Sequence, residues 1–306
     1  MISVVIPLYN KEKQIAATLQ SVLQQSFLDF EVVVVNDGST DGSVAAAEAV
    51  QDARIRIIHQ ENAGVSAARN RGIAAAKYEL IAFLDADDRW KPEYLQTQYE
   101  LTQKYPECSV FACNYEFVHA DGSIRPTIIR KLPFEGQDGI LSNYFEVASC
   151  SHPPICSISI VVRKAALLAI SGFPVGITNG EDLLTWAALA CQFKIAYSSK
   201  VIACYNLGDK HGANSIPVNI PPGDAVGRKM RLMSTEFPMP YFREYISRWY
   251  RIRANLFLRA GWNVVAIRNI FLSLRYNPWN WHMYVYTAIL VVPTKFRNFI
   301  FKLFSR

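Results

Sequence analysis

The first 84 residues alternate short apolar segments with segments of helical spacing, and this alternation limits the chain to few folds. Four segments read as buried strands because they are apolar and rich in β-branched residues: 3–8, 30–36, 54–60 and 79–84. The residues between them have apolar side chains at helical spacing, in 12–25, 41–50 and 65–77. Strands separated by single helices are typical of βαβ units, so we expect an α/β fold with a mainly parallel, Rossmann-like sheet flanked by helices.

Three carboxylates, Asp85, Asp87 and Asp88, directly follow the last of these strands. Like charges this close repel each other, and their burial without partners is costly. In an extended segment, residues i and i+2 point to the same side, so we expect Asp85 and Asp87 to face one ion. Mg²⁺ or Mn²⁺ fits this pattern, because these cations bind oxygen ligands and are held by one or two carboxylates plus substrate phosphates. A solvated surface turn is the alternative reading of an isolated pair of this kind.

A second acidic position follows the strand over 30–36. In open α/β sheets, ligands bind beyond the carboxyl ends of the strands, and both Asp37 and Asp85 lie at such ends. We therefore expect the two carboxylates to converge on one crevice. The alternative for Asp37 is that its side chain only initiates a turn.

The charge of the chain changes sign near residue 224, just after a proline-rich stretch over 217–222. Residues 1–224 carry 18 Lys and Arg against 24 Asp and Glu, whereas residues 225–306 carry 14 against 2. This shift predicts an α/β domain over 1–224 and a basic, aromatic-rich helical region over 225–306. A hydrophobic content of 51% excludes a disordered chain. The six cysteines lack metal-ligand spacing and indicate reduced thiols in a cytoplasmic compartment.

Three segments together resemble family 2 of the inverting, nucleotide-sugar-dependent glycosyltransferases, which have the GT-A fold. They contain VVIPLYN and VVVVNDGST within 4–43, SAARNRG and FLDADDRW within 63–95, and an acidic pair after Gly-Phe within 171–189. The resemblance covers about residues 2–215 and implies a divalent metal cofactor, Mn²⁺ or Mg²⁺. It also implies sugar transfer from a nucleotide-diphosphate donor, a UDP-sugar, to a hydroxyl of a lipid-linked or cell-surface polysaccharide or glycolipid precursor.

The resemblance assigns roles to residues that match the family motifs. Asp182 would be the catalytic base, and Asp87 would ligate the cation together with Asp85 and His211. The alternative for Asp182 and its neighbour Glu181 is that they only stabilise the start of a helix over 181–192. The residues that would bind the donor nucleotide are Pro7, Tyr9, Asn10, Asp37, Arg69 and Asp85.

The chain also departs from the family pattern. Asn36 stands where many members have an aspartate, so recognition of the base is expected to differ. No Q-x-x-R-W-like segment follows the acidic pair, and no long multi-span membrane region is present. Both absences favour a non-processive enzyme that transfers one or a few sugars.

The basic C-terminal region predicts an additional partner. Arginines alternate with aromatic and aliphatic residues at helical spacing over 243–276. The apolar run over 283–292 is half as long as the roughly twenty residues that a spanning helix needs. We therefore expect peripheral attachment to an anionic membrane surface, on the cytoplasmic face of the cell membrane. The alternative is a helical subdomain that packs on the core; nothing here resembles a nucleic-acid-binding module.

Two other functions compete with this interpretation. A sugar-nucleotide nucleotidyltransferase would have a glycine-rich, basic triphosphate loop near its N-terminus, which PLYNKEKQ does not resemble. It would also not need Asp182. The second alternative is a non-catalytic nucleotide-sugar-binding module of the same fold, which the intact Asp85, Asp87 and Asp182 disfavour. The sequence does not identify the sugar, the base, the acceptor or the oligomeric state.

Overall fold

The computed structural model describes residues 1–208, 223–293 and 296–297. The strands are β1 (Ile2–Leu8), β2 (Phe30–Asp37), β3 (Ile55–Gln60), β4 (Leu80–Phe83), β5 (Arg89–Trp90), β6 (Val110–His119), β7 (Ile124–Pro126), β8 (Asp138–Ile140), β9 (Ile160–Arg163) and β10 (Ile195–Gly208). The helices are α1 (Ile15–Leu23), α2 (Ser43–Glu48), α3 (Val65–Ala75), α4 (Tyr94–Lys104), α5 (Tyr144–Cys150), α6 (Lys164–Ala169), α7 (Glu181–Gln192), α8 (Ala225–Glu236), α9 (Phe242–Arg259), α10 (Asn263–Tyr276) and α11 (Trp281–Ile289).

The strands form one sheet in the order β3-β2-β1-β4-β9-β6-β10-β5. The strands β3, β2, β1 and β4 are parallel, as the alternating pattern predicts. The remainder of the sheet is mixed, because β9 runs antiparallel to both of its neighbours while β6 and β10 run parallel to each other. The parallel half places the ends of β1, β2 and β4 at one edge.

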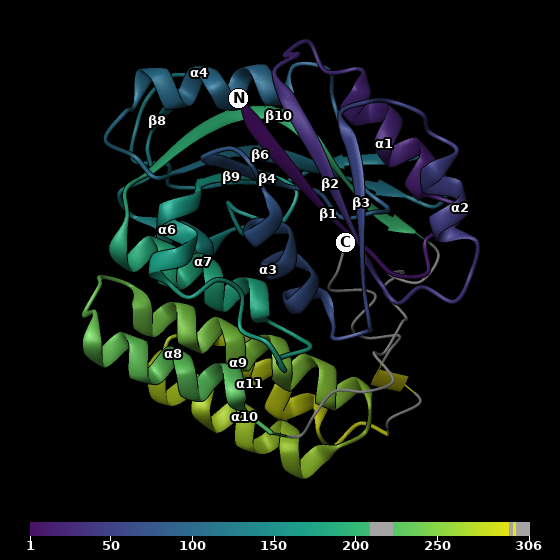
Figure 1. The fold of residues 1–306 in the computed structure, drawn as a ribbon. Helices are drawn as coiled ribbons and strands as arrows, with labels where there is room; N and C mark the ends of the chain where they lie inside the picture. The colour runs from purple at the N-terminus through teal and green to yellow at the C-terminus, as the bar shows by residue number, and fades with distance from the viewer. Residues whose placement is uncertain (209–222, 294–295, 298–306) are drawn as a thin grey trace.

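Helices cover both faces of the sheet (Figure 1). The α1 and α4 helices lie on one face, and α3, α6 and α7 lie on the other. The C-terminal helices α8 to α11 form a further layer beneath α7. The site edge of the sheet is therefore bordered by α3 and α7, which belong to the same face.

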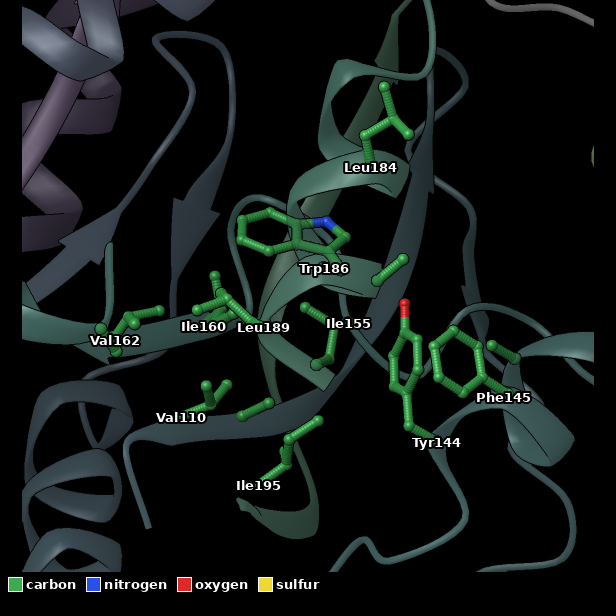
Figure 2. Close-up of a cluster of buried hydrophobic side chains, with 14 of the residues drawn as sticks. Val110, Tyr144, Phe145, Ile155, Ile160, Val162, Leu184, Trp186, Leu189 and Ile195 are labelled. Atoms are coloured by element: carbon green, nitrogen blue, oxygen red, sulfur yellow. The ribbon is translucent and has the colours of Figure 1, made fainter. Parts of the chain in front are cut away.

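The core beneath α7 extends into the C-terminal helices. Figure 2 shows Trp186 and Leu189 of α7 between sheet residues such as Ile160 and the aromatic pair of α5, Tyr144 and Phe145. The ring of Phe145 stacks on Phe242 of α9, with 4.2 Å between the ring centroids. Side chains on both sides of residue 224 thus contribute to a single hydrophobic cluster.

The helical pattern over 243–276 is broken into two antiparallel helices at Gly261, whose φ of +79° suits glycine. The two helices are joined by buried polar side chains: Ser247 of α9 and Ser273 of α10 share a hydrogen bond of 2.9 Å, and Asn280 donates to both. None of the helices in the described residues is both long enough and apolar enough to span a membrane. All six cysteines are free, and Cys150 is exposed.

Candidate active site

A cavity of about 470 Å³ lies where β1, β2 and β4 end. Six residues that the sequence assigns to the site line it: Pro7, Tyr9, Asp37, Arg69, Asp85 and Asp87. Residues without a predicted role complete it, and these include Lys11, Asn62, Gly64, Asp88, Glu181, Tyr205 and Asn206. Polar groups from six segments that are separate in the sequence therefore meet in one cavity.

The acids after β4 lie in a tight turn and not in the extended segment that the sequence predicts. The N–H of Asp88 donates to the carbonyl of Asp85 at 3.0 Å, and Thr18 of α1 donates to the carbonyls of Ala86 and Asp88. The turn forms because β4 ends at the sheet edge, where α1 supplies the hydroxyl that binds its carbonyls. It still brings Asp85, Asp87 and Asp88 together.

Two of these three carboxylates have cationic partners. The ammonium group of Lys11 lies 2.5 Å from Asp87, and Arg69 donates to Asp85 at 2.8 Å. Asp88 is buried, and among the described residues its carboxylate accepts one hydrogen bond, from the backbone N–H of Asn206 at 2.6 Å. Burial raises the pKa of Asp88 well above its usual value, and the negative charges of Asp85 and Asp87 add to this effect.

Arg69 of α3 connects the acidic turn to α7. Its side chain is 3% exposed, and besides Asp85 its Nη2 atom donates to Ser157 at 3.0 Å. Its Nη1 atom lies 3.9 Å from Glu181 and has no hydrogen-bond partner in the described residues. The guanidinium group also lies over the ring of Phe173, 5.1 Å from its centroid. Burial among these groups fixes the position of the arginine.

The carboxylate of Asp37 organises the loop before α3. It accepts hydrogen bonds of 2.9 Å from the N–H groups of Ala63 and Gly64, and one of 2.7 Å from the side chain of Gln60. These bonds hold the first residues of α3 against the end of β2. Asp37 therefore stabilises the loop before α3 and also lines the cavity.

The acidic pair begins α7, as the sequence predicts, and its two side chains have different surroundings. Glu181 lines the cavity, whereas Asp182 does not; Asp182 accepts the N–H of Leu183 at 2.7 Å. Burial raises the pKa of Glu181 to about 7, with a further contribution from the charge of Asp182. Burial likewise raises the pKa of Asp182, against the opposing charge of Arg69.

Two other predicted site residues are not in the cavity wall. Asn10, with a φ of +52°, accepts the N–H of Thr40 at 2.9 Å and stabilises the loop beside the cavity. This local hydrogen bond explains why its side chain points away from the cavity. His211 lies outside the described residues. No role was predicted for Lys11 or Asp88; Asp88 is adjacent to Asp87 in the acidic motif, and Lys11 directly follows the PLYN segment that contains Tyr9 and Asn10.

The donor set at the acidic turn fits a hard divalent cation. Carboxylate oxygens of Asp85 and Asp87 face the cavity, and oxygen is the ligand that Mg²⁺ and Mn²⁺ prefer. Within residues 1–208, 223–293 and 296–297, no three His, Cys, Asp or Glu side chains are grouped in a way that could hold a metal alone. A cation at this turn therefore needs further oxygen ligands from a substrate.

A parallel half-sheet with this acidic turn at the end of a central strand is the architecture of the GT-A class of glycosyltransferase folds. The crystal structure of Staphylococcus aureus TarS residues 1–349 in complex with UDP-GlcNAc has the same fold, with a TM-score of 0.67. It is 20% identical in sequence, and the alignment covers 90% of this chain and 81% of TarS.

The sequence comparisons define the family. Residues 3–154 match the model described as glycosyl transferase family 2. Glycosyltransferase GlyA of Streptococcus pneumoniae is 29% identical over 211 residues, which are 67% of this chain and 30% of GlyA. The putative teichuronic acid biosynthesis glycosyltransferase TuaG of Bacillus subtilis is also 29% identical over 211 residues, 68% of this chain and 79% of TuaG. The chain belongs to glycosyl transferase family 2, and it spans less than half the length of GlyA and of several other curated relatives.

Proposed function

We propose that this protein transfers a sugar from a nucleoside-diphosphate donor, a UDP-sugar, to a hydroxyl group of a lipid-linked or cell-surface glycan precursor. The transfer is a single displacement that inverts the anomeric configuration, and it adds one or a few sugars. The observation that carries this proposal is the convergence of Asp37, Arg69, Asp85, Asp87 and Glu181 on one cavity at the ends of parallel strands.

The walls of the cavity suit the parts of such a donor. Pro7, Tyr9 and Asp37 surround the space for the nucleoside, with Tyr9 47% exposed and free to pack on a base. Lys11 and Arg69 provide positive charge for the diphosphate. When Lys11 binds a phosphate, Asp87 loses its only ion-pair partner among the described residues and becomes available to a cation.

Asp87 and Asp85 are the residues that would hold Mn²⁺ or Mg²⁺, with His211 as a further candidate ligand. Bound there, the ion offsets the negative charge that develops on the departing nucleoside diphosphate. Arg69 keeps Asp85 in place, and Asn206 binds the backbone of the turn at Asp87.

The acceptor hydroxyl becomes a nucleophile when a carboxylate removes its proton. We assign this base to Asp182, whose raised pKa brings its proton affinity closer to neutral pH. Glu181 positions Arg69 from the opposite side of the guanidinium to Asp85. Asp182 begins α7 and Asp85 and Asp87 follow β4, so in this proposal the base and the diphosphate-binding groups belong to different elements, as a single displacement requires.

We also propose that the protein works at the inner face of the cell membrane as a peripheral protein. Five exposed side chains of α10 lie at spacings of three and four residues, so that they form one face: Val264, Ile267, Arg268, Phe271 and Arg275. An apolar face with interspersed cations is typical of helices that lie in the surface of an anionic bilayer.

The test is a screen of the purified protein against UDP-, GDP- and TDP-sugars with Mn²⁺ or Mg²⁺, measuring release of the nucleoside diphosphate. We expect release from one class of donor, and its loss when EDTA is added and in the Asp87→Asn variant. Release of pyrophosphate from a nucleoside triphosphate would instead identify a nucleotidyltransferase. Donor binding without release, with any acceptor, would identify a binding module.

A further inference from the structure

A second cavity, of about 680 Å³, lies between α5, α9 and the turn that precedes α11. Its walls come from residues 128–131, the end of α5, one side of α9 and residues 277–282. We call it the α9 cavity. It is larger than the donor cavity, and none of the family motifs contributes to it.

The α9 cavity is basic, because Arg130, Lys131, Arg248 and Arg251 line it together with Glu146 and Glu244, and Lys131 pairs with Glu146 at 2.7 Å. Arg248 and Arg251 lie one turn apart on α9, and both line the cavity. In the part of the chain that the structure describes, neither guanidinium lies within ion-pair distance of a carboxylate, although Glu244 also lines the cavity. Burial lowers the pKa of both arginines, and their mutual repulsion lowers that of Arg248 further.

The existing hydrogen bonds leave donors available in this cavity. Arg248 donates through its Nη1 atom to the carbonyls of Ala148 and Ser151, at the C-terminal end of α5. These two bonds use only one nitrogen of the guanidinium group. Arg251 lies 3.3 Å from the ring of His282. The pKa of His282 is lowered to about 4 by burial and by the charge of Arg251, so this histidine is neutral at pH 7 and adds no charge. Two guanidinium forks without carboxylates suit a phosphate group.

Aromatic side chains border the same cavity. Trp279 is 90% exposed, Trp281 is 59% exposed and Tyr241 is 45% exposed. Exposed tryptophans beside polar groups are unusual on a surface without a ligand. The flat, weakly polar C–H face of a sugar ring packs on such rings. The cavity thus offers both a phosphate site and a sugar-binding surface.

One aromatic ring contacts a lining residue of the α9 cavity and a lining residue of the donor cavity. Phe117 of β6 contacts His152, which lines the α9 cavity, and Tyr205, which lines the donor cavity; the centroid distances are 5.6 Å and 5.9 Å. Tyr245, one turn before Arg248, donates to the carbonyl of Leu183, the residue after Asp182. The residues around the α9 cavity are therefore linked by direct contacts to α7, which carries the acidic pair, and to the wall of the donor cavity.

We propose that the α9 cavity binds the acceptor, and that this acceptor carries a phosphate or phosphodiester next to the sugar ring that is extended. The role of the bound molecule as acceptor rests on the proposed function. The presence of an anion-binding site does not depend on it. Arg248 and Arg251 hold the phosphate, and Trp281 packs on the adjacent sugar. The phosphate belongs either to a lipid diphosphate linkage or to a phosphodiester polymer.

The test measures binding of four probes by calorimetry, with the donor cavity saturated by UDP. The probes are inorganic phosphate, N-acetylglucosamine 1-phosphate and a prenyl-diphosphate-linked N-acetylglucosamine in detergent, with a glycerol-phosphate oligomer as the polymer arm. We expect the sugar phosphates to bind more tightly than inorganic phosphate, and Arg251→Gln to weaken them at least tenfold. Trp281→Ala should weaken the sugar-containing probes and leave inorganic phosphate unchanged.

Arg243→Gln is the matched control, because Arg243 is on α9, is exposed and lies outside the cavity. Preference for the prenyl-linked probe identifies a lipid-linked acceptor, and preference for the oligomer identifies a polymer. The proposal is overturned if Arg243→Gln and Arg251→Gln lose probe affinity equally. It is also overturned if Arg251→Gln and the Arg248→Lys/Arg251→Gln double variant both bind the probes with wild-type affinity. If UDP itself fails to bind, the proposed function fails. Binding of the same probes without UDP still tests whether the α9 cavity binds anions.

Discussion

The guanidinium group of Arg69 and the carboxylate of Asp85 are joined by a 2.8 Å hydrogen bond across the candidate active site. Asp85 follows β4, Arg69 belongs to α3, and the other side of the guanidinium lies 3.9 Å from Glu181 at the start of α7. One buried cation therefore sets the relative positions of three elements. Its removal leaves several carboxylates close together without compensation.

We expect Arg69→Met to lower the free energy of unfolding by roughly 3–5 kcal/mol, because it leaves buried negative charge unpaired. Arg69→Lys should recover part of the stability but not kcat/KM, since a lysine cannot bridge Asp85 and Glu181 with a planar fork. Urea unfolding and nucleoside diphosphate release measure the two effects. Arg71→Met, at an exposed position of the same helix, is the control. Wild-type stability of Arg69→Met would contradict this account.

Asp182→Asn should lower kcat by roughly 10²–10⁴-fold, the range typical of a lost general base. UDP binding should be unchanged, because Asp182 does not line the donor cavity. Glu181→Gln should act mainly through Arg69, with a smaller loss of kcat. Steady-state kinetics and UDP calorimetry separate these outcomes, and a larger loss in Glu181→Gln than in Asp182→Asn would reverse the two roles.

The pKa of Glu181, raised to about 7 by burial, predicts a pH dependence. Below this pH the carboxyl is protonated and no longer balances Arg69, so kcat/KM should fall as the pH decreases through 7. In Glu181→Gln the acidic limb should move to lower pH, because loss of the negative charge also lowers the pKa of Asp182. A pH–rate profile from 5 to 9 checks this. An acidic limb at the same pH in both proteins would assign it to another group.

Gly72→Ala should destabilise the protein although alanine favours helices. A Cβ atom at this position of α3 would lie 2.2 Å from Cγ1 of Val5 on β1. The helix propensity gain is about 1 kcal/mol, whereas overpacking costs roughly 1–3 kcal/mol and displaces the helix that carries Arg69. In a Val5→Ala background the same substitution should be less harmful. Thermal unfolding of the four proteins tests this, and additive effects would rule out the contact.

Ile267→Asp and Phe271→Asp should weaken binding to vesicles that contain anionic lipid, because each places a charge on the exposed face of α10. Point substitutions are preferable to deletion of the C-terminal residues, since Asn280 and Met283 are buried against α9 and α10. Cosedimentation at low and high salt is the measurement. Leu28→Asp, at an exposed position outside this face, is the control. Equal binding by all variants would contradict a role for α10.

The predictable part of the site consists of residues at strand ends. Asp37 and Asp85 could be placed together because parallel strands end at the same edge of a sheet. The turn over Asp85 to Asp88 could not be predicted, because it depends on the hydroxyl of Thr18 from another helix. Lys11 was missed for the same reason, since its partner Asp87 is distant in the sequence. Local patterns do not reveal such pairings.

The sequence alone determined the order of strands and helices in the first half, the positions of the acidic motifs and the family. The order of strands and helices follows from local periodicity, which records whether each residue faces the core or solvent, whereas the family follows from the resemblance of the three motif-bearing segments. Only the tertiary structure decided that β9 runs antiparallel, that Glu181 rather than Asp182 lines the donor cavity, and that Arg248 and Arg251 line the α9 cavity. The reason is that periodicity identifies a buried face but not the element that covers it.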